Sequence, residues 1–122
     1  MQAKTLAALK FGQNPTMLRK SRRQRSNRKL LEILREMLPQ ISLHDFQRIE
    51  EIASRGHLRH LPDSIVAWQA TTTHIRHNHT DYDALLAEGY DAESARHFVL
   101  ERMNEKLEEW GCLRRISDEE TD

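Results

Sequence analysis

Three histidines, one arginine and two aspartates fall within the ten residues 74–83, which read H-I-R-H-N-H-T-D-Y-D. Imidazole nitrogens and carboxylate oxygens are common ligands of zinc and related divalent ions. If Ile75 faces the core of a helix that turns by about 100° per residue, the opposite face carries His74, His77 and Asp81. The spacing therefore suggests a divalent metal site with these three ligands and an open position at which water is activated.

The same segment has two other interpretations, and both treat it as a corner between helices. A helix break predicted at Thr80 moves Asp81 away from the histidines, and polar side chains then fix the helix end by binding carbonyl groups or by pairing with arginine. Alternatively, the corner is a surface that binds phosphate or another partner. In both cases we expect Arg96 to lie close enough to pair with Asp83 or Asp81. The expected corner consists of Arg76, His77, Tyr82, Asp83 and Arg96.

Positive charge is concentrated near the N-terminus, although the whole chain has 19 basic and 19 acidic residues. Residues 1–31 contain nine basic side chains and no acidic one. Guanidinium groups bind phosphate oxygens and displace counterions, so this pattern predicts an RNA or DNA contact. The alternatives are a solubilising tail, or an arm that binds an acidic surface of this chain or of a protein partner. Seven of the nine form the basic block: Arg19, Lys20, Arg22, Arg23, Arg25, Arg28 and Lys29.

Apolar residues recur at helical spacing from Asn27 onward, and no segment alternates at period two. Ser42 with Asp45 and Thr80 with Asp83 resemble capping boxes, while glycines offer helix stops. These signals predict an all-α fold, a small bundle of about five helices. The helices are expected to begin near Asn27, Ser42, Pro62, Thr80 and Asp91 and to end near Leu38, Gly56, Thr80, Gly89 and Gly111.

The predicted helices divide the chain into three parts. We expect a basic, flexible arm over residues 1–26, a helical domain over residues 27–116 and an acidic, disordered tail over residues 117–122. The core of the helical domain is expected to contain Trp68, Leu85, Phe98 and Trp110.

Length and motif content exclude several classes of protein. With 122 residues and one cysteine, Cys112, the chain predicts one small domain without an internal disulfide. No apolar run approaches the roughly 18 residues that span a bilayer, so we expect a cytoplasmic protein without membrane contact. Glycine-rich phosphate loops, C-x-x-C and G-x-S-x-G are missing from the sequence, which removes the common nucleotide, redox and hydrolase signatures. No cofactor is expected apart from a divalent ion at the histidines.

The segment from Leu61 to Trp110 resembles the domain of unknown function 2293, a family of bacteria and fungi. The family pattern has Leu-Pro or Ile-Pro, then a helix ending in Arg-His, two variable residues, Thr, a variable residue and Tyr-Asp. Ala-Arg and a helix that ends near Trp follow. His79 falls at a position that the pattern leaves variable. The resemblance implies a shared fold and a shared site, but no particular activity. The matching positions are Pro62, Arg76, His77, Thr80, Tyr82, Asp83, Ala95, Arg96 and Trp110, and the implied site comprises Arg76, His77, Tyr82 and Asp83.

Two classes of function follow from these residues. The basic block, and the lack of a complete catalytic constellation in the sequence, favour a nucleic-acid-binding accessory factor that contacts phosphates through the block and the Arg76/His77 corner. The net charge of −9 on residues 32–122 opposes this interpretation. The alternative is a metal-dependent hydrolase or nuclease that uses the three suggested ligands, with Asp83 as the base. A third interpretation is an adaptor whose basic arm binds an acidic protein.

Overall fold

The computed structural model describes residues 28–58 and 60–117, which form five α-helices and no strand. The predicted all-α fold is confirmed for this part of the chain. The predicted arm, residues 1–26, lies outside the described residues, as do residues 118–122 of the predicted tail. No helix among the described residues is long and apolar enough to cross a membrane. The α-helices cover residues 28–37 (helix 28–37), Leu43–Ala53 (α3), Asp63–Asn78 (α4), Tyr82–Ala87 (α5) and Ala92–Glu109 (α6), and a 3-10 turn covers Gly56–Leu58 (η1).

Side-chain caps start α3 and α6 at the predicted positions. The Ser42 hydroxyl accepts a hydrogen bond from the Asp45 amide at 3.2 Å and donates one to the Asp45 carboxylate at 2.9 Å. Asp91 accepts a hydrogen bond from the Ser94 amide at 2.7 Å. These side chains satisfy amide groups that have no partner within their helix, and they thereby fix where each helix begins.

Two of the three predicted glycine stops are present. Gly89 follows α5 with φ 106°, and Gly111 follows α6 with φ 84°. At Gly111 a Cβ atom would lie only 2.9 Å from Pro39, so the close approach of two loops requires glycine there. The prediction for Gly56 is wrong, because α3 ends at Ala53 and Gly56 opens the 3-10 turn η1 without a positive φ.

The predicted capping box at Thr80 is also wrong. The Thr80 hydroxyl oxygen accepts a hydrogen bond from the Tyr82 amide at 3.1 Å, not from the amide of Asp83. The Asp83 carboxylate contacts His77 instead of returning to Thr80. The helix break that the sequence predicted is nevertheless present, because α4 ends at Asn78 and α5 starts at Tyr82.

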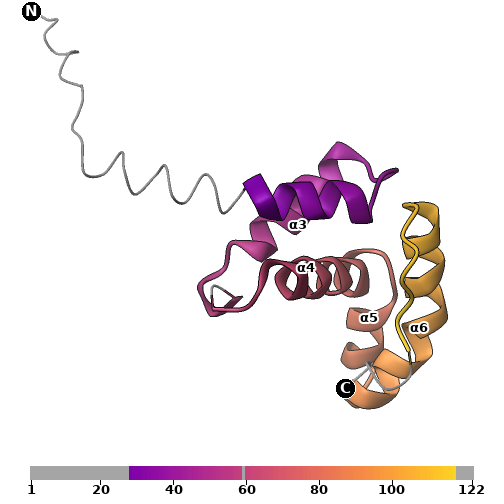
Figure 1. Cartoon of the computed structure of the whole chain (residues 1–122). Coiled ribbons are helices and arrows are strands. Elements are labelled where there is room, and N and C mark those ends of the chain that lie inside the picture. Colours follow the sequence, from indigo (N-terminus) through magenta and orange to yellow (C-terminus); the bar gives the residue numbers. More distant parts are fainter. Residues whose placement is uncertain (1–27, 59, 118–122) are drawn as a thin grey trace, which may run out of the picture.

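Helix α4 lies at the centre of the fold and contacts α3, α5 and α6 (Figure 1). Helix 28–37 and α3 lie on one side of it, and α5 and α6 lie on the other. Because α4 is surrounded, it buries polar residues as well as apolar ones, and the buried Thr71 hydroxyl donates to the Ala67 carbonyl at 2.7 Å. The largest fully buried apolar side chains are Leu34, Leu38, Ile49, Ile75 and Leu107.

The segment after α6 turns back along that helix (Figure 1). Asn104, which is buried in α6, donates from Nδ2 to the Ile116 carbonyl at 3.1 Å and accepts from the Ile116 amide at 2.7 Å. Cys112 and Ile116 are buried against the core. The packed part of the chain therefore continues past the end of α6.

Three of the four residues predicted to lie in the core do so, and the prediction for Phe98 is wrong. Trp68 and Trp110 are buried, and Leu85 is partly buried against the core, but the Phe98 side chain is 61% exposed. The apolar stripe of α6 is wider than the face that α6 buries. Val99 takes the core position, and Phe98, about 100° away on the helix, lies edge-to-face with the partly exposed ring of Tyr90, with the ring centroids 5.5 Å apart.

Phe98→Ala should therefore destabilise the domain by less than about 1 kcal/mol, because little apolar surface is lost from the core. Met103→Ala on the same helix should cost about 3 kcal/mol, since Met103 is 2% exposed and its removal leaves a cavity. Urea unfolding followed by circular dichroism measures both values. A larger cost for Phe98→Ala than for Met103→Ala would contradict the described packing of α6.

Candidate functional site

Asp45, His74 and His79 form a polar cluster that joins α3 to the end of α4, and we call it the His–Asp cluster. The Nε2 atoms of His74 and His79 lie 2.7 Å and 2.8 Å from the same oxygen, Oδ1 of Asp45. The side chains of His74, Asp45 and His79 are 3%, 15% and 22% exposed. The cluster is therefore largely shielded from water, with His79 on its open side.

Helix ends position each member of the cluster. Asp45 lies in the first turn of α3, where the Ser42 hydroxyl donates to its second oxygen, Oδ2. His74 lies in the last turns of α4, and His79 caps the C-terminus of that helix. Trp110, the C-cap of α6, covers both rings, with centroid distances of 6.3 Å to His74 and 5.5 Å to His79.

Burial and hydrogen bonding set the charges in the cluster. Burial raises the pKa of the Asp45 carboxyl, but hydrogen bonds from the two histidines and Ser42 outweigh it and hold this pKa well below its ordinary value of 3.8. Burial lowers the pKa of His74 below its ordinary 6.5, and the attraction of Asp45 offsets only part of that effect. At neutral pH the cluster consequently contains a carboxylate and a neutral His74 ring.

Asn78 selects the tautomer of His74. Its side-chain nitrogen donates to the His74 carbonyl at 3.1 Å and lies 3.2 Å from Nδ1 of the His74 ring. An amide nitrogen only donates, so Nδ1 is the acceptor and the ring proton lies on Nε2, which donates to Asp45. His74 thus connects the end of α4 to the first turn of α3.

These pKa shifts predict that the domain loses stability in acid. Unfolded His74 titrates near 6.5 and folded His74 below it, so the unfolded state binds more protons as the pH falls past 6.5. Asp45 adds a second loss below 3.8, because its folded pKa is depressed. We expect the melting temperature in metal-free buffer to fall between about pH 7 and about pH 5. His74→Gln should flatten the dependence of the melting temperature on pH, and His77→Gln should not. If both variants show the same dependence, the loss of stability does not come from His74.

The expected corner forms where α4 meets α5. His77 Nδ1 lies 2.8 Å from the Asp83 carboxylate, and its ring meets the buried Tyr82 edge-to-face at 5.3 Å. The Arg76 guanidinium lies over the ring of the same tyrosine, 5.7 Å from the ring centroid. The structure therefore brings Arg76, His77, Tyr82 and Asp83 together, with the histidine and the aspartate exposed.

Arg96 does not make the expected ion pair. No ion pair joins it to Asp81 or Asp83 within residues 28–58 and 60–117. Its Nε atom and that of Arg76 are both buried without a hydrogen-bond partner in the same part of the chain. Burial lowers the pKa of Arg76, and the positive charge of Arg96 lowers it further. The corner therefore holds two neighbouring guanidinium groups whose charges repel each other.

The predicted metal ligands His74, His77 and Asp81 do not come together. The only group of metal-binding side chains found among the described residues is Asp45, His74 and His79. The prediction assumed a solvent-facing side of α4 opposite Ile75, but α4 is packed against other helices on several sides, so His74 points into the fold. His77 instead binds Asp83, and Asp81 is exposed.

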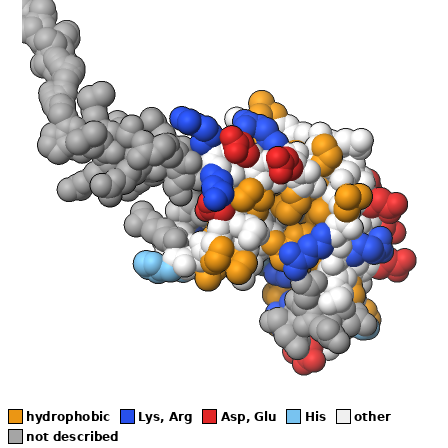
Figure 2. Space-filling model, in the orientation of Figure 1, with side chains coloured by type: hydrophobic (Ala, Val, Ile, Leu, Met, Phe, Trp, Pro, Cys, Tyr) orange, Lys and Arg blue, Asp and Glu red, His pale blue; other side chains and the backbone are white. Residues whose placement is uncertain are grey.

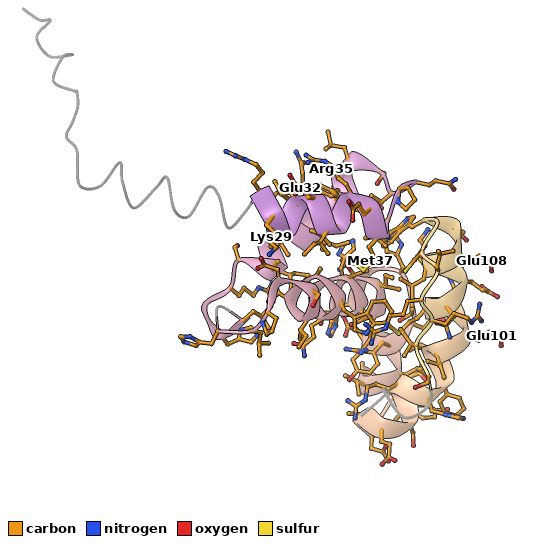
Figure 3. The ribbon with its side chains drawn as sticks, viewed as in Figure 1. Lys29, Glu32, Arg35, Met37, Glu101 and Glu108 are labelled. Carbon is orange, nitrogen blue, oxygen red and sulfur yellow. The ribbon has the colours of Figure 1, made fainter. Side chains whose placement is uncertain are left out.

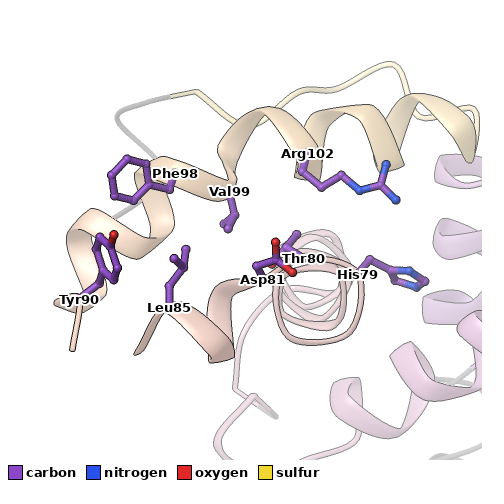
Figure 4. Close-up of a pocket in the computed structure, with 8 residues that line it drawn as sticks. All are labelled: His79, Thr80, Asp81, Leu85, Tyr90, Phe98, Val99 and Arg102. Carbon is purple, nitrogen blue, oxygen red and sulfur yellow. The ribbon is translucent and has the colours of Figure 1, made fainter. Parts of the chain in front are cut away.

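A pocket of about 490 Å³ lies between the α4–α5 junction and α6, next to the His–Asp cluster. In Figure 4, His79 and Arg102 lie at one end of this pocket, and Tyr90 and Phe98 lie at the other. Of the predicted site residues only Asp81 lines it. The pocket thus has a polar end beside the cluster and an aromatic end beside the exposed pair.

A family model described as "Uncharacterized conserved protein (DUF2293)" matches residues 32–111, about two thirds of the chain. The chain belongs to the DUF2293 family. The match begins upstream of Leu61, where the resemblance in the sequence started, and it includes the whole of the His–Asp cluster and of the corner. No curated protein and no solved structure matches the chain.

Two residues of the cluster were missed by reasoning from the sequence. Asp45 was visible only as a capping residue of α3, and His79 stands at a position that the DUF2293 pattern leaves variable. Asp45 lies 29 residues before His74, so helical periodicity carries no signal for their contact. The one available signal was the occurrence of three histidines within the six residues 74–79.

Proposed function

We propose that this DUF2293 member is an accessory factor that binds RNA or DNA through its basic block. The observation that carries the proposal is that residues 1–31 contain nine basic side chains and no acidic one. Each Lys or Arg that neutralises a phosphate releases counterions, and this gain requires no fixed protein geometry. A block without carboxylates has no local partner for its charge, so a polyanion is a suitable ligand.

The block runs directly into helix 28–37. Arg28 and Lys29 are exposed in the first turn of this helix, and Arg35 is exposed further along it. Lys29, Glu32 and Arg35 project from the helix in Figure 3, and basic and acidic side chains lie next to each other on the same face in Figure 2. Because the later turns are mixed in charge, the phosphate contacts belong to the block and to the first turn.

The acidic side chains of the folded part are compatible with this role. Exposed Glu101 and Glu108 project from α6 at the right edge of the view, away from Lys29 (Figure 3). At physiological ionic strength, repulsion between exposed charges is largely screened beyond about 8 Å. The charges of Glu101 and Glu108 therefore act weakly on phosphates that are held at the block, whereas the exposed Glu32, three residues after Lys29 in the same helix, opposes them.

Two further features of the folded part support a nucleic-acid ligand. The neighbouring guanidinium groups of Arg76 and Arg96 have no acidic partner among the described residues, which suits a second phosphate contact. Tyr90 and Phe98 are 43% and 61% exposed beside a pocket that Arg102 also lines. Exposed aromatic rings form a platform on which unpaired bases stack, and Arg102 lies at the other end of the same pocket.

Recovery of the tagged protein from cells, with and without nuclease treatment, tests this proposal. RNA or DNA should accompany the protein in the untreated sample, and the purified protein should bind labelled RNA or duplex DNA at low salt. A variant with all seven block residues replaced by Gln is the control and should bind far more weakly. If an acidic protein accompanies the chain regardless of nuclease, the adaptor interpretation replaces this one.

The described residues give less support to a metal-dependent hydrolase of the predicted kind. That enzyme required His74, His77 and Asp81 as ligands and Asp83 as base, whereas Asp83 is bound to His77 and the three ligands are separate. We also infer a cytosolic location for the nucleic-acid-binding function, which fits a chain whose one cysteine, Cys112, is free and buried.

A further inference from the structure

We propose that Asp45, His74 and His79 bind one divalent transition metal, for which zinc is the best-suited ion. One ligand atom from each residue lies within 4.8 Å of the other two, although the residues come from two helices. Two imidazole nitrogens and one carboxylate oxygen are an ordinary protein ligand set for zinc. This site is separate from the basic block, so the inference does not depend on nucleic-acid binding.

The spacing of the ligand atoms is close to what a metal requires. Both Nε2 atoms point at Oδ1 of Asp45, at 2.7 Å and 2.8 Å. Zinc bonds of about 2.0 Å in tetrahedral geometry place ligand atoms about 3.3 Å apart. The two pairs that include Oδ1 of Asp45 therefore have to open by only about 0.5 Å, a movement that small side-chain rotations supply, and the ligand atoms of the two histidines already lie within 4.8 Å of each other.

Metal binding also requires a shift of ring protons, and the surroundings of the cluster allow it. A neutral histidine that ligates through Nε2 carries its proton on Nδ1. For His74 this means that the amide of Asn78, an exposed residue, turns so that its oxygen accepts the Nδ1 proton. No net proton is released from a ring that is already neutral.

Neighbouring side chains hold the ligands in place, as they do in established metal sites. Ser42 donates to Oδ2 of Asp45, which directs the other oxygen, Oδ1, towards both rings. Asn78 lies beside Nδ1 of His74, where an outer partner of a metal-bound imidazole belongs. Trp110 stacks against the His74 ring, meets the His79 ring edge-to-face, and limits the access of water from that side.

The pocket provides an entry path and room for a further ligand. His79 is a member of the cluster and also lines the pocket of about 490 Å³ (Figure 4). The described residues add no fourth His, Cys, Asp or Glu to the group, so the remaining coordination position belongs to water or to a small anion. Arg102 lines the same end of the pocket, and its guanidinium pairs with Glu105 at 3.4 Å and with Glu109 at 3.6 Å.

Zinc binding to the full chain, first dialysed against a chelator, tests the inference. Elemental analysis after incubation with zinc and desalting should find one zinc per chain. At a free zinc concentration about one hundred times the dissociation constant, the melting temperature should rise by roughly 10 °C. Co²⁺ should give the visible absorption of a tetrahedral nitrogen–oxygen site.

His79→Gln separates metal binding from hydrogen bonding. Its amide nitrogen can still donate to Asp45, but the imidazole ligand is gone, so the thermal shift and the Co²⁺ spectrum should disappear. His77→Gln, the same change at an exposed histidine outside the cluster, should keep both signals. The inference is overturned if the wild type shows no zinc-dependent shift, if His79→Gln keeps it, or if His77→Gln loses it.

Discussion

The affinity of the chain for duplex DNA should fall steeply with salt, with a log–log slope of roughly −4 to −6. Each phosphate contact on a duplex releases about 0.9 counterion, and five to seven of the seven block residues are expected to engage. On single-stranded RNA the release is about 0.7 per contact, so the slope should be shallower. A slope of about −5 means roughly a thousand-fold loss of affinity between about 50 mM and about 200 mM salt, which fluorescence anisotropy measures.

Two variants locate the origin of this slope. Replacing all seven block residues by Gln should flatten the slope and leave the melting temperature nearly unchanged, because exposed charges contribute little to folding. Arg48→Gln with Arg55→Gln removes two exposed charges from α3 and its end, outside the block, and should leave the slope as it is. A loss of folding stability in the seven-residue variant would instead assign the block to a protein interface.

Capping residues and glycines predicted the helix ends well, because these residues act on backbone groups only a few positions away. Ser42 and Asp91 accept hydrogen bonds from amides three residues ahead, and Gly89 and Gly111 adopt the positive φ that ends a helix. Such contacts span a few residues, so their pattern is visible in the sequence. The prediction for Gly56 was wrong because α3 already ends at its C-cap Ser54, and Gly56 is the first residue of η1.

The burial of side chains could not be predicted from one helix at a time. Phe98 belongs to the apolar stripe of α6, but it lies beyond the face that α6 turns to the core. His74 was placed on a solvent face of α4, yet three helices surround α4 and His74 is 2% exposed. Which part of a helix is covered depends on its neighbours, and that information is absent from its own periodicity.

The site was predicted only in part, because some of its contacts are local in the sequence and others depend on how the helices pack. His77, Tyr82 and Asp83 lie within seven residues, and the turn between α4 and α5 is enough to bring them together. The contact between Asp45 and His74 spans 29 residues and depends on how α3 packs on α4. The short-range corner was therefore accessible from spacing, whereas the His–Asp cluster was accessible only from the fold.

Replacing Asp45 by alanine should destabilise the domain by about 4 kcal/mol, although aspartate to alanine is often a small change at a protein surface. The substitution leaves two shielded ring N–H groups, on His74 and His79, without their acceptor, and each costs about 1–3 kcal/mol. It also removes the carboxylate that receives the Ser42 hydroxyl at the start of α3, worth about 1 kcal/mol. The melting temperature in chelator-containing buffer should fall by roughly 20 °C.

Asp83→Ala is the matched control, because Asp83 also binds a histidine at 2.8 Å. Its side chain is 61% exposed and that of His77 is 43% exposed, so water replaces the lost contact and the expected cost is below about 1 kcal/mol. Asp45→Asn, which keeps one oxygen acceptor for the rings, should fall between the two and keeps the comparison possible if Asp45→Ala does not fold. Equal destabilisation by Asp45→Ala and Asp83→Ala would show that the buried cluster does not hold α3 to α4, because Asp45 is more buried than Asp83 and has three side-chain partners where Asp83 has one.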